Sequence, residues 1–258
     1  MIEIAFLGSG SSGNCAVIRS GGTTVLLDAG LSMRETKRRL RLLDVEITEV
    51  SAVFLTHEHA DHMHGAATLV TKLDIPVFAT AGTLALSRLP GPLFADERTV
   101  EGGVEVRVGE LHVRVTETPH DGIESVCYTF TDGDGRRVGV VTDLGHLSRA
   151  VIEALADCEV IGLEANHDVD LLRAGPYPFV LKQRILSDVG HLSNEAAAFG
   201  LRRLVGGKTK SVVALHVSKQ NNTPSLARQV FAEAIEEIGA SVTLDVARPD
   251  QPLGFLSV

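Results

Sequence analysis

The chain has 258 residues, of which 44% are hydrophobic and 22% are charged, and its formal net charge is −9 at pH 7. This length and composition favour one large hydrophobic core, so we expect a single domain over residues 1–258. The acidic balance argues against a broad surface for nonspecific polyanion binding, although bound metal ions can supply positive charge locally.

The N-terminus lacks the basic and long apolar segments of a signal peptide, and no uncharged apolar run is long enough to span a bilayer. The cysteines, Cys15, Cys127 and Cys158, lie far apart in apolar settings and have the character of buried hydrophobic residues in a reducing compartment. We therefore expect a cytoplasmic protein with no membrane contact.

Strands are predicted where β-branched and apolar residues lie between Gly or Asp turns. In chain order they cover residues 2–7, 15–19, 23–28, 51–56, 76–80, 104–108, 111–116, 126–131 and 136–142. Helical patterns interleave at residues 32–43, 64–73, 81–88, 148–155, 193–205 and 224–238. A hairpin-rich first half followed by alternating helices and strands predicts two mixed sheets packed face to face, with helices outside. The expected fold class is α/β (α+β), arranged as a four-layer αββα sandwich.

The strand predicted at residues 51–56 leads into the motif H-x-H-x-D-H, formed by His57, His59, Asp61 and His62, with Gly65 three residues later. Imidazole nitrogens bind transition metals such as zinc, and a carboxylate also suits manganese. The spacing allows His57 and His59 to contact one ion while Asp61 and His62 contact its neighbour. A chance group of structural histidines is a poor explanation, because the spacing and the position at a strand end fit a metal site.

Three further candidate ligands follow predicted strands. His120 comes after residues 113–119 and Asp143 after residues 138–142, and His216 closes residues 211–215, a further apolar run that we also interpret as a strand. Each alone is as consistent with a turn or cap residue as with a ligand, but together with the complete motif they predict one site at a common edge. We predict two divalent ions, one held by His57, His59 and His120, the other by Asp61, His62 and His216, with Asp143 as the bridge.

This order of ligands is similar to that of the metallo-β-lactamase superfamily, and the similarity spans nearly the whole chain. The segment Leu26-Leu27-Asp28-Ala29-Gly30 also resembles the first motif of that family. The resemblance implies the metallo-β-lactamase fold and a structural role for Asp28, which would hold the histidine loop by hydrogen bonds without binding metal. It leaves the substrate open, because fold and metals are shared by enzymes of different function.

Four more motifs narrow the resemblance: GSGSSGN at residues 8–14, LEANHD at 163–168, GHLSNE at 190–195 and HVSKQNN at 216–222. Together they most closely resemble the YycJ/WalJ branch, whose members are regarded as 5′-to-3′ exodeoxyribonucleases with a suggested link to DNA repair. The free backbone N–H groups of the first motif suit an anion, and an ordinary flexible turn is the alternative reading. These motifs contain the predicted substrate-binding residues Ser11, Ser12, Asn14, Asn166 and Asn222.

Glu164 and His191 resemble a pair found in phosphodiesterases such as tRNase Z, where a histidine backed by a glutamate faces the leaving group. A structural ion pair is the alternative reading. As a general acid, His191 would contribute roughly 10²–10⁴-fold to the rate. The predicted catalytic residues are Asp61, His191 and Glu164.

These features predict a dinuclear metal-dependent phosphodiesterase that acts on nucleic acid, most simply DNA, as a 5′-to-3′ exonuclease. The expected cofactors are two divalent ions, Zn²⁺ or Mn²⁺. With two carboxylates and a bridging hydroxide they leave roughly one positive charge, which favours an anionic phosphate. The hydroxide is expected to attack phosphorus while the ions clamp the attacking and leaving oxygens.

Three alternatives stay open: a hydrolase of a small ester, thioester or lactone, a ribonuclease related to tRNase Z, and a DNA-binding or scaffold protein that keeps metals for stability. The complete ligand set argues against the third. The basic residues do not distinguish a nucleic-acid substrate from the alternatives, because a charged helix face is more often solvated than part of a polynucleotide-binding track. Five of them cluster on one predicted helix: Arg34, Lys37, Arg38, Arg39 and Arg41.

Overall fold

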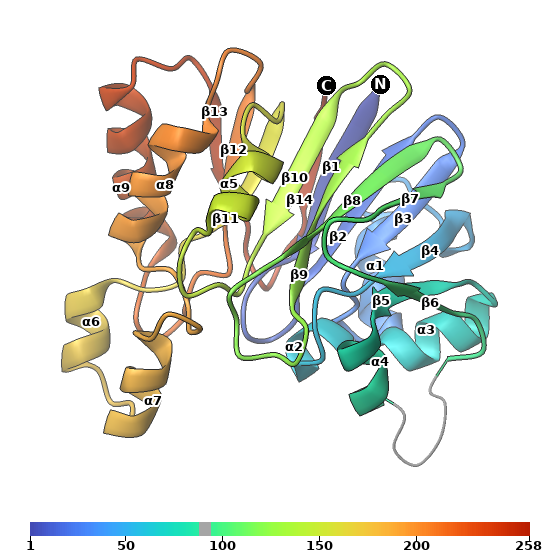
Figure 1. Ribbon diagram of the computed structural model, residues 1–258, viewed down its shortest axis with the longest axis horizontal. Helices are drawn as coiled ribbons and strands as arrows, with labels where there is room; N and C mark the ends of the chain where they lie inside the picture. Colours follow the sequence, from blue (N-terminus) through green and yellow to red (C-terminus); the bar gives the residue numbers. More distant parts are fainter. Residues whose placement is uncertain (88–93) are drawn as a thin grey trace.

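The computed structural model describes residues 1–87 and 94–258, and these form two seven-stranded sheets with helices on their outer faces (Figure 1). The first sheet has the order β14 (Leu253–Ser257), β1 (Ile2–Gly8), β2 (Cys15–Ser20), β3 (Thr23–Leu27), β4 (Val50–Phe54), β5 (Val77–Thr80) and β6 (Glu97–Val100). The second has the order β13 (Thr243–Val246), β12 (Ser211–Leu215), β11 (Val160–Glu164), β10 (Arg137–Val141), β9 (Val126–Thr131), β8 (Leu111–Glu117) and β7 (Glu105–Val108). The predicted αββα sandwich of mixed sheets is confirmed.

Both sheets change from antiparallel to parallel pairing along their width. In the first sheet, β14, β1, β2 and β3 pair antiparallel, whereas β3 through β6 pair parallel. In the second, β7 through β10 pair antiparallel and β10 through β13 pair parallel. Parallel neighbours end at the same edge of a sheet, so loops after β3, β4, β10, β11 and β12 gather side chains at one edge of each sheet.

The space between the sheets is filled by apolar and aromatic side chains. The Phe54 ring of β4 lies 5.3 Å from the ring of Tyr128 and 5.6 Å from that of Phe130, both on β9 of the other sheet. The buried Tyr128 hydroxyl donates to the Leu55 carbonyl at 2.8 Å, which satisfies a polar group that burial would otherwise leave costly. This bond ties the second sheet to the residue two positions before the histidine motif.

The helices complete the outer layers (Figure 1). They are α1 (Met33–Arg41), η1 (Ile47–Glu49), α2 (Ala60–Met63), α3 (Ala66–Leu73), α4 (Ala81–Ser87), α5 (Arg149–Leu155), α6 (Val169–Ala174), α7 (Phe179–Ile185), α8 (Asn194–Leu204) and α9 (Pro224–Glu237). Leu40 and Leu69 belong to the core between the first sheet and helices α1 and α3. Val151, Leu201 and Phe231 belong to the core between the second sheet and helices α5, α8 and α9.

Most predicted elements lie within two or three residues of the observed ones. Helix α8 begins after Ser193, whose hydroxyl accepts from the Ala196 N–H, and α9 begins with Pro224 in its first turn. The helix predicted at residues 64–73 begins at Ala66 in the structure, where the short helix α2 precedes it. The helix predicted at residues 81–88 is α4, and residue 88 lies outside the described residues. The predicted ranges do not include β6, β11, β13, β14, η1, α2, α6 and α7.

The basic cluster on α1 is mostly neutralised within the protein. Glu35 accepts from Arg38 at 2.7 Å and from Arg39 at 2.6 Å, and Arg41 lies 3.3 Å from Glu46. Arg39 is buried and also donates to the carbonyls of residues 7 and 249. The solvated-face interpretation is therefore wrong for Arg39, which joins the N-terminal and C-terminal parts of the chain.

In the described ranges, no helix has both the length and the apolar character that crossing a membrane requires. All three cysteines are buried and free, as the sequence predicts.

Candidate metal centre

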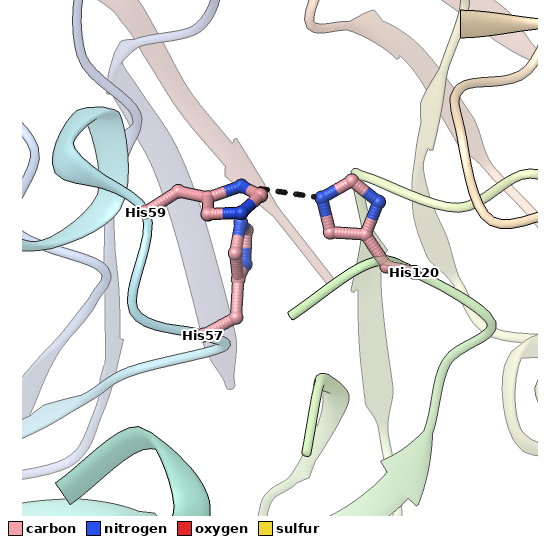
Figure 2. Close-up of side chains that lie close together, drawn as sticks. All are labelled: His57, His59 and His120. Carbon is pink, nitrogen blue, oxygen red and sulfur yellow. Dashed lines mark hydrogen bonds between the residues drawn. The ribbon is translucent and has the colours of Figure 1, made fainter. Parts of the chain in front are cut away.

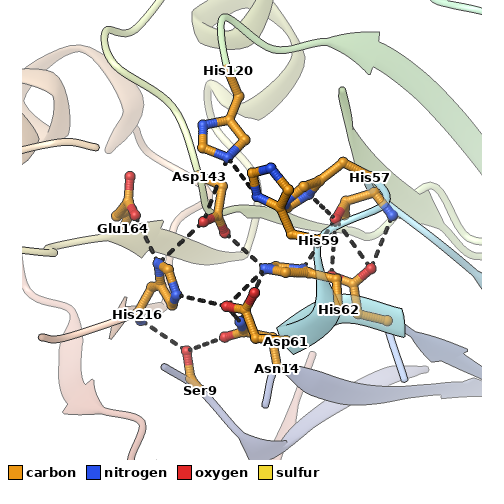
Figure 3. Close-up of polar contacts among 12 residues, drawn as sticks. Ser9, Asn14, His57, His59, Asp61, His62, His120, Asp143, Glu164 and His216 are labelled. Carbon is orange, nitrogen blue, oxygen red and sulfur yellow. Dashed lines mark hydrogen bonds and ion pairs between the residues drawn. The ribbon is translucent and has the colours of Figure 1, made fainter. Parts of the chain in front are cut away.

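Three strand ends and one loop bring the predicted metal ligands to one place between the sheets (Figure 3). The histidine motif follows β4, Asp143 and His216 follow β10 and β12, and His120 lies in the loop between β8 and β9. Asp143 and His216 have left-handed backbones, with φ of 59° and 52°. Such conformations are unfavourable for residues other than glycine and concentrate at functional sites, where the surrounding structure holds them.

One group of candidate ligand atoms comes from His57, His59 and His120 (Figure 2). The His57 ring lies 4.5 Å from that of His59 and 4.9 Å from that of His120, and His59 Nδ1 is 3.4 Å from His120 Nε2. One nitrogen from each ring falls within 4.8 Å of the others. This spacing is compatible with three imidazoles around a single transition-metal ion.

A second group comes from Asp61, His62 and His216. Asp61 Oδ2 lies 3.6 Å from His62 Nε2 and 3.4 Å from His216 Nε2. The Asp143 carboxylate faces both groups, because Oδ2 is 3.1 Å from His62 Nε2 while Oδ1 is 3.9 Å from His120 Nε2. The structure thus brings together all seven residues that the sequence selects as metal ligands.

The outward-facing ring nitrogens are held by the protein. His57 Nδ1 lies 2.9 Å from Thr56 Oγ1, and His62 Nδ1 lies 2.8 Å from Asp28 Oδ2. His120 Nδ1 contacts the carbonyls of residues 189 and 190 at 3.1 Å, and His216 Nδ1 contacts a carboxylate at 2.9 Å. Histidines that bind metal commonly use one nitrogen in this way, which fixes the ring and leaves the other nitrogen free.

Asp28 supports the motif without entering it. Its Oδ1 accepts from the Thr56 backbone N–H at 2.9 Å, and its Oδ2 is the partner of His62 Nδ1. The hydrogen-bonding role that the sequence predicts for Asp28 is confirmed. Two residues after Asp28, Gly30 packs against the motif. A Cβ at this position would lie 1.7 Å from the Asp61 carbonyl oxygen, so only a glycine allows the loop to approach the motif this closely.

The electrostatics of the site favour bound cations. Burial lowers the pKa of His57 well below its usual value, so this imidazole is neutral and offers a lone pair. Burial also opposes protonation of His216, but Asp143, Asp61 and Glu164 raise its pKa to about 10. Buried carboxylates therefore demand positive charge at this position, and divalent ions can provide it.

Two buried nitrogens test whether metal ions fit. In the described part of the chain, His57 Nε2 and His216 Nε2 have no hydrogen-bond partner. Buried polar atoms are nearly always satisfied, so nitrogens that lack a hydrogen bond and face neighbouring carboxylates and imidazoles call for another partner. Neutral imidazole and carboxylate are the donor types that zinc and manganese accept, and the residues present fit such ions.

Comparison with known proteins agrees with this geometry. The family model described as a β-lactamase superfamily domain matches residues 23–217. The chain belongs to the β-lactamase superfamily. Two full-length relatives within it are the exodeoxyribonuclease YycJ of Bacillus anthracis, 34% identical over 93% of this chain and 92% of its own, and the exodeoxyribonuclease WalJ of Streptococcus pneumoniae, 33% identical over 95% and 94%.

A solved structure confirms the fold of this superfamily member. The metallo-β-lactamase fold protein YhfI from Bacillus subtilis aligns with a TM-score of 0.75 at 15% identity, covering 98% of this chain and 99% of its own. The two chains therefore share the whole αββα sandwich, which is the fold that the sequence predicts.

The superfamily fold also places Glu164 and His191 beside the ligand groups. His191 Nδ1 lies 2.8 Å from Glu164 Oε1 and 3.6 Å from Asp143 Oδ1. Burial alone would lower the pKa of His191, but the Glu164 carboxylate raises it above its usual value. The pair predicted from the sequence is thus formed, with a protonated imidazole favoured next to the site.

Glu164 contacts more groups than the sequence predicts. Besides His191 it accepts from His216 Nδ1 at 2.9 Å through Oε1, and from the N–H groups of Leu144 and Leu192 at 3.2 and 3.0 Å through Oε2. The burial of Glu164 raises its pKa, but the imidazoles of His191 and His216 dominate and lower the value to about 2. One buried carboxylate therefore orients a candidate ligand and the candidate acid together.

The predicted substrate-binding residues fall into two sets. Ser11 and Ser12 are exposed, whereas the three asparagines are buried. Asn14 Nδ2 lies 3.2 Å from Asp61 Oδ2 and 3.0 Å from His62 Nε2, so it contacts the second ligand group. Asn166 donates to the His216 carbonyl and Asn222 to the Ala165 carbonyl, which holds the loops after β11 and β12 together.

Sequence reasoning missed Asp121. Its Oδ1 lies 3.5 Å from His59 Nε2 and 3.4 Å from His120 Nε2, and its other oxygen pairs with Arg184 of α7. The only signal for it in the sequence is its position next to His120. It adds a carboxylate to the edge of the first ligand group and links that edge to α7.

Proposed function

We propose that this chain is a dinuclear metal-dependent exodeoxyribonuclease. Full-length similarity to two relatives named exodeoxyribonuclease carries the proposal, and the site geometry supports it. In this proposal His57, His59 and His120 hold one ion, Asp61, His62 and His216 hold the other, and Asp143 bridges them. The ions are Zn²⁺ or Mn²⁺, the substrate is DNA, and the direction is 5′ to 3′.

When bound, the two ions supply positive charge for the phosphate and lower the pKa of the attacking water. The protein supplies their fixed geometry through Thr56, Asp28, Glu164 and the carbonyls behind His120, which hold the rings in place. Because these contacts are made before substrate arrives, little reorganisation is needed when negative charge develops on the phosphate.

His191 is proposed to protonate the leaving oxygen. Its Nδ1 is occupied by Glu164 at 2.8 Å, so a proton for the leaving group comes from Nε2. The ring centroid lies 5.4 Å from that of His120 and 5.3 Å from that of His216, both of which follow strands of the second sheet. Glu164 raises the pKa of His191 against the effect of burial, which favours the protonated form that a general acid requires.

A substrate comparison tests the proposal. Metal-loaded protein is given end-labelled single-stranded DNA, single-stranded RNA, a lactone and a thioester, each with Mn²⁺ and with Zn²⁺. We expect stepwise shortening of DNA from the 5′ end, with a chelator-treated sample as the control. Intact DNA and RNA beside rapid lactone or thioester turnover would favour a small-molecule hydrolase, and faster cleavage of RNA than of DNA would favour a ribonuclease.

A further inference from the structure

A pocket of about 230 Å³ is lined in part by Val217, the residue that follows the candidate ligand His216. Its walls come from three segments that are far apart in the sequence: the turn containing Ser11 and Ser12, the loop containing Ser218 and Lys219, and Tyr177 between α6 and α7. The GSGSSGN and HVSKQNN motifs thus meet in one cavity, which gives these motifs a common place in the structure.

Short stretches of chain connect this pocket to the site. Ser12 is two residues from Asn14, whose Nδ2 is 3.2 Å from Asp61 Oδ2, and Lys219 is three residues from His216. Three residues span at most about 11 Å even when extended. The pocket is therefore within one or two nucleotides of the proposed ions.

The pocket walls are fixed by buried contacts. Arg39 Nη1 donates to the Leu7 carbonyl at 2.6 Å and the Pro249 carbonyl at 2.9 Å, and Pro249 lines the pocket. Ser218 Oγ accepts from the backbone N–H groups of residues 220 and 221 at 3.3 and 3.2 Å. A preformed wall reduces the ordering cost of binding a ligand.

The chemistry of the walls suits a phosphate group. Lys219 is exposed and forms no ion pair with another described residue. The nearby carboxylate of Asp250 is paired with Arg248 at 3.1 Å and leaves the Lys219 ammonium free for a ligand. In the same ranges, the backbone N–H groups of Ser11 and Ser12 donate to no protein acceptor, whereas the Gly13 N–H is bonded within the turn. An unpaired ammonium and free N–H groups form an anion site.

The size of the pocket limits what it can hold. Pockets that enclose drug-sized ligands measure roughly 300–1,000 Å³, so about 230 Å³ accommodates one phosphate with its sugar and not a run of nucleotides. The half-buried Tyr177 lines the pocket, and aromatic side chains stack on single-stranded bases of any sequence. A DNA strand whose phosphate occupies this pocket has no room to continue through it, so the bound phosphate is the terminal one.

We propose that this pocket binds the 5′-terminal phosphate of the DNA strand, with Lys219 and the N–H groups of Ser11 and Ser12 as its anion contacts and Tyr177 against the terminal base. The inference rests on the proposed exonuclease function. It makes the pocket the part of the site that recognises the strand end and sets how far the scissile bond lies from it.

The test uses single-stranded oligonucleotides that differ only in a 5′-phosphate, a 5′-hydroxyl or a 3′-phosphate. Metal-loaded wild type is expected to prefer the 5′-phosphate over the 5′-hydroxyl by roughly 10–100-fold in kcat/KM, mainly through KM, because a charged contact is lost without it. Lys219→Ala is expected to bring this ratio close to one, and Lys219→Arg to keep most of it. Lys210→Ala, an exposed lysine at the opposite end of β12, is the matched control and keeps the preference.

Two results would overturn the inference while leaving the exonuclease function intact. One is DNA degradation in which Lys219→Ala keeps the full 5′-phosphate preference. The other is a preference for the 3′-phosphate that Lys219→Ala removes. Absence of DNA cleavage by wild type would instead overturn the proposed function itself, so the two failures are distinguishable. Thermal unfolding of Lys219→Ala at the wild-type temperature verifies that its fold is unchanged.

Discussion

Replacing Asp61 by alanine is expected to lower the rate of DNA hydrolysis by at least about 10²-fold, the range associated with losing one electrostatic contact to a transition state. Asp61 Oδ2 lies within 3.6 Å of both His62 Nε2 and His216 Nε2, so the variant leaves the second ligand group with two imidazoles and no carboxylate of its own. A single retained ion cannot clamp the attacking and leaving oxygens together. The measurement combines the single-turnover rate with the metal content of the same sample.

Asp134→Ala is the matched control for this variant. Asp134 is 65% exposed in the hairpin between β9 and β10, at the end of β10 opposite Asp143, and its surface ion pairs contribute little to stability. It is expected to keep the wild-type rate and both ions. An Asp61→Ala protein that also keeps the wild-type rate would show that Asp61 is not needed for the reaction.

His191→Ala is expected to keep both ions and most substrate affinity but to lower the chemical rate by roughly 10²-fold or more. The imidazole is oriented by Glu164 at 2.8 Å and is not needed to complete either proposed ligand group. An aryl phosphodiester, whose leaving group needs little protonation, should recover much of the lost rate. Loss of the alkaline limb of the pH–rate profile would be the accompanying sign, because a general acid is active only while protonated.

Two further variants help to distinguish the possible roles of His191: a control on another histidine, and a change of the carboxylate that orients His191. His112→Ala removes a partly exposed histidine of β8 that pairs with Glu105, and it is expected to leave rate and metal content unchanged. Glu164→Gln should lower both the rate and the metal content. The Glu164 carboxylate accepts from His191, from His216 and from the backbone, and the NH₂ group of a glutamine would face at least one of these donors with a donor of its own. If His191→Ala loses an ion, His191 is a ligand; if it changes neither rate nor metal content, the pair is structural.

The meeting of the candidate ligands was predictable because their signals are local. His57, His59, Asp61 and His62 fall within six residues after a clear strand, and Asp143 and His216 each end a short apolar run. Parallel strands bring Asp143 and His216 to one edge of the second sheet, and the face-to-face packing of the two predicted sheets brings that edge to the histidine motif after β4.

Other parts could not be predicted because their determinants are tertiary. The edge strands β13 and β14 are only partly buried and lack a clear apolar alternation, and β6 has a single buried residue. Helix α7 begins with Phe179 and Val180, both more than 70% exposed, so its apolar residues do not mark a core face. The double contact of Glu164 with two histidines depends on how the ends of β11 and β12 lie side by side.

The central claim, that two ions act together on a DNA phosphodiester, is tested most directly by titrating metal-free protein with Mn²⁺ while nucleotide release from single-stranded DNA is measured. We predict that binding saturates at two ions per chain and that the rate rises with the second, because Asp143 faces both ligand groups. A full rate with one ion bound, or intact DNA with two, would contradict it.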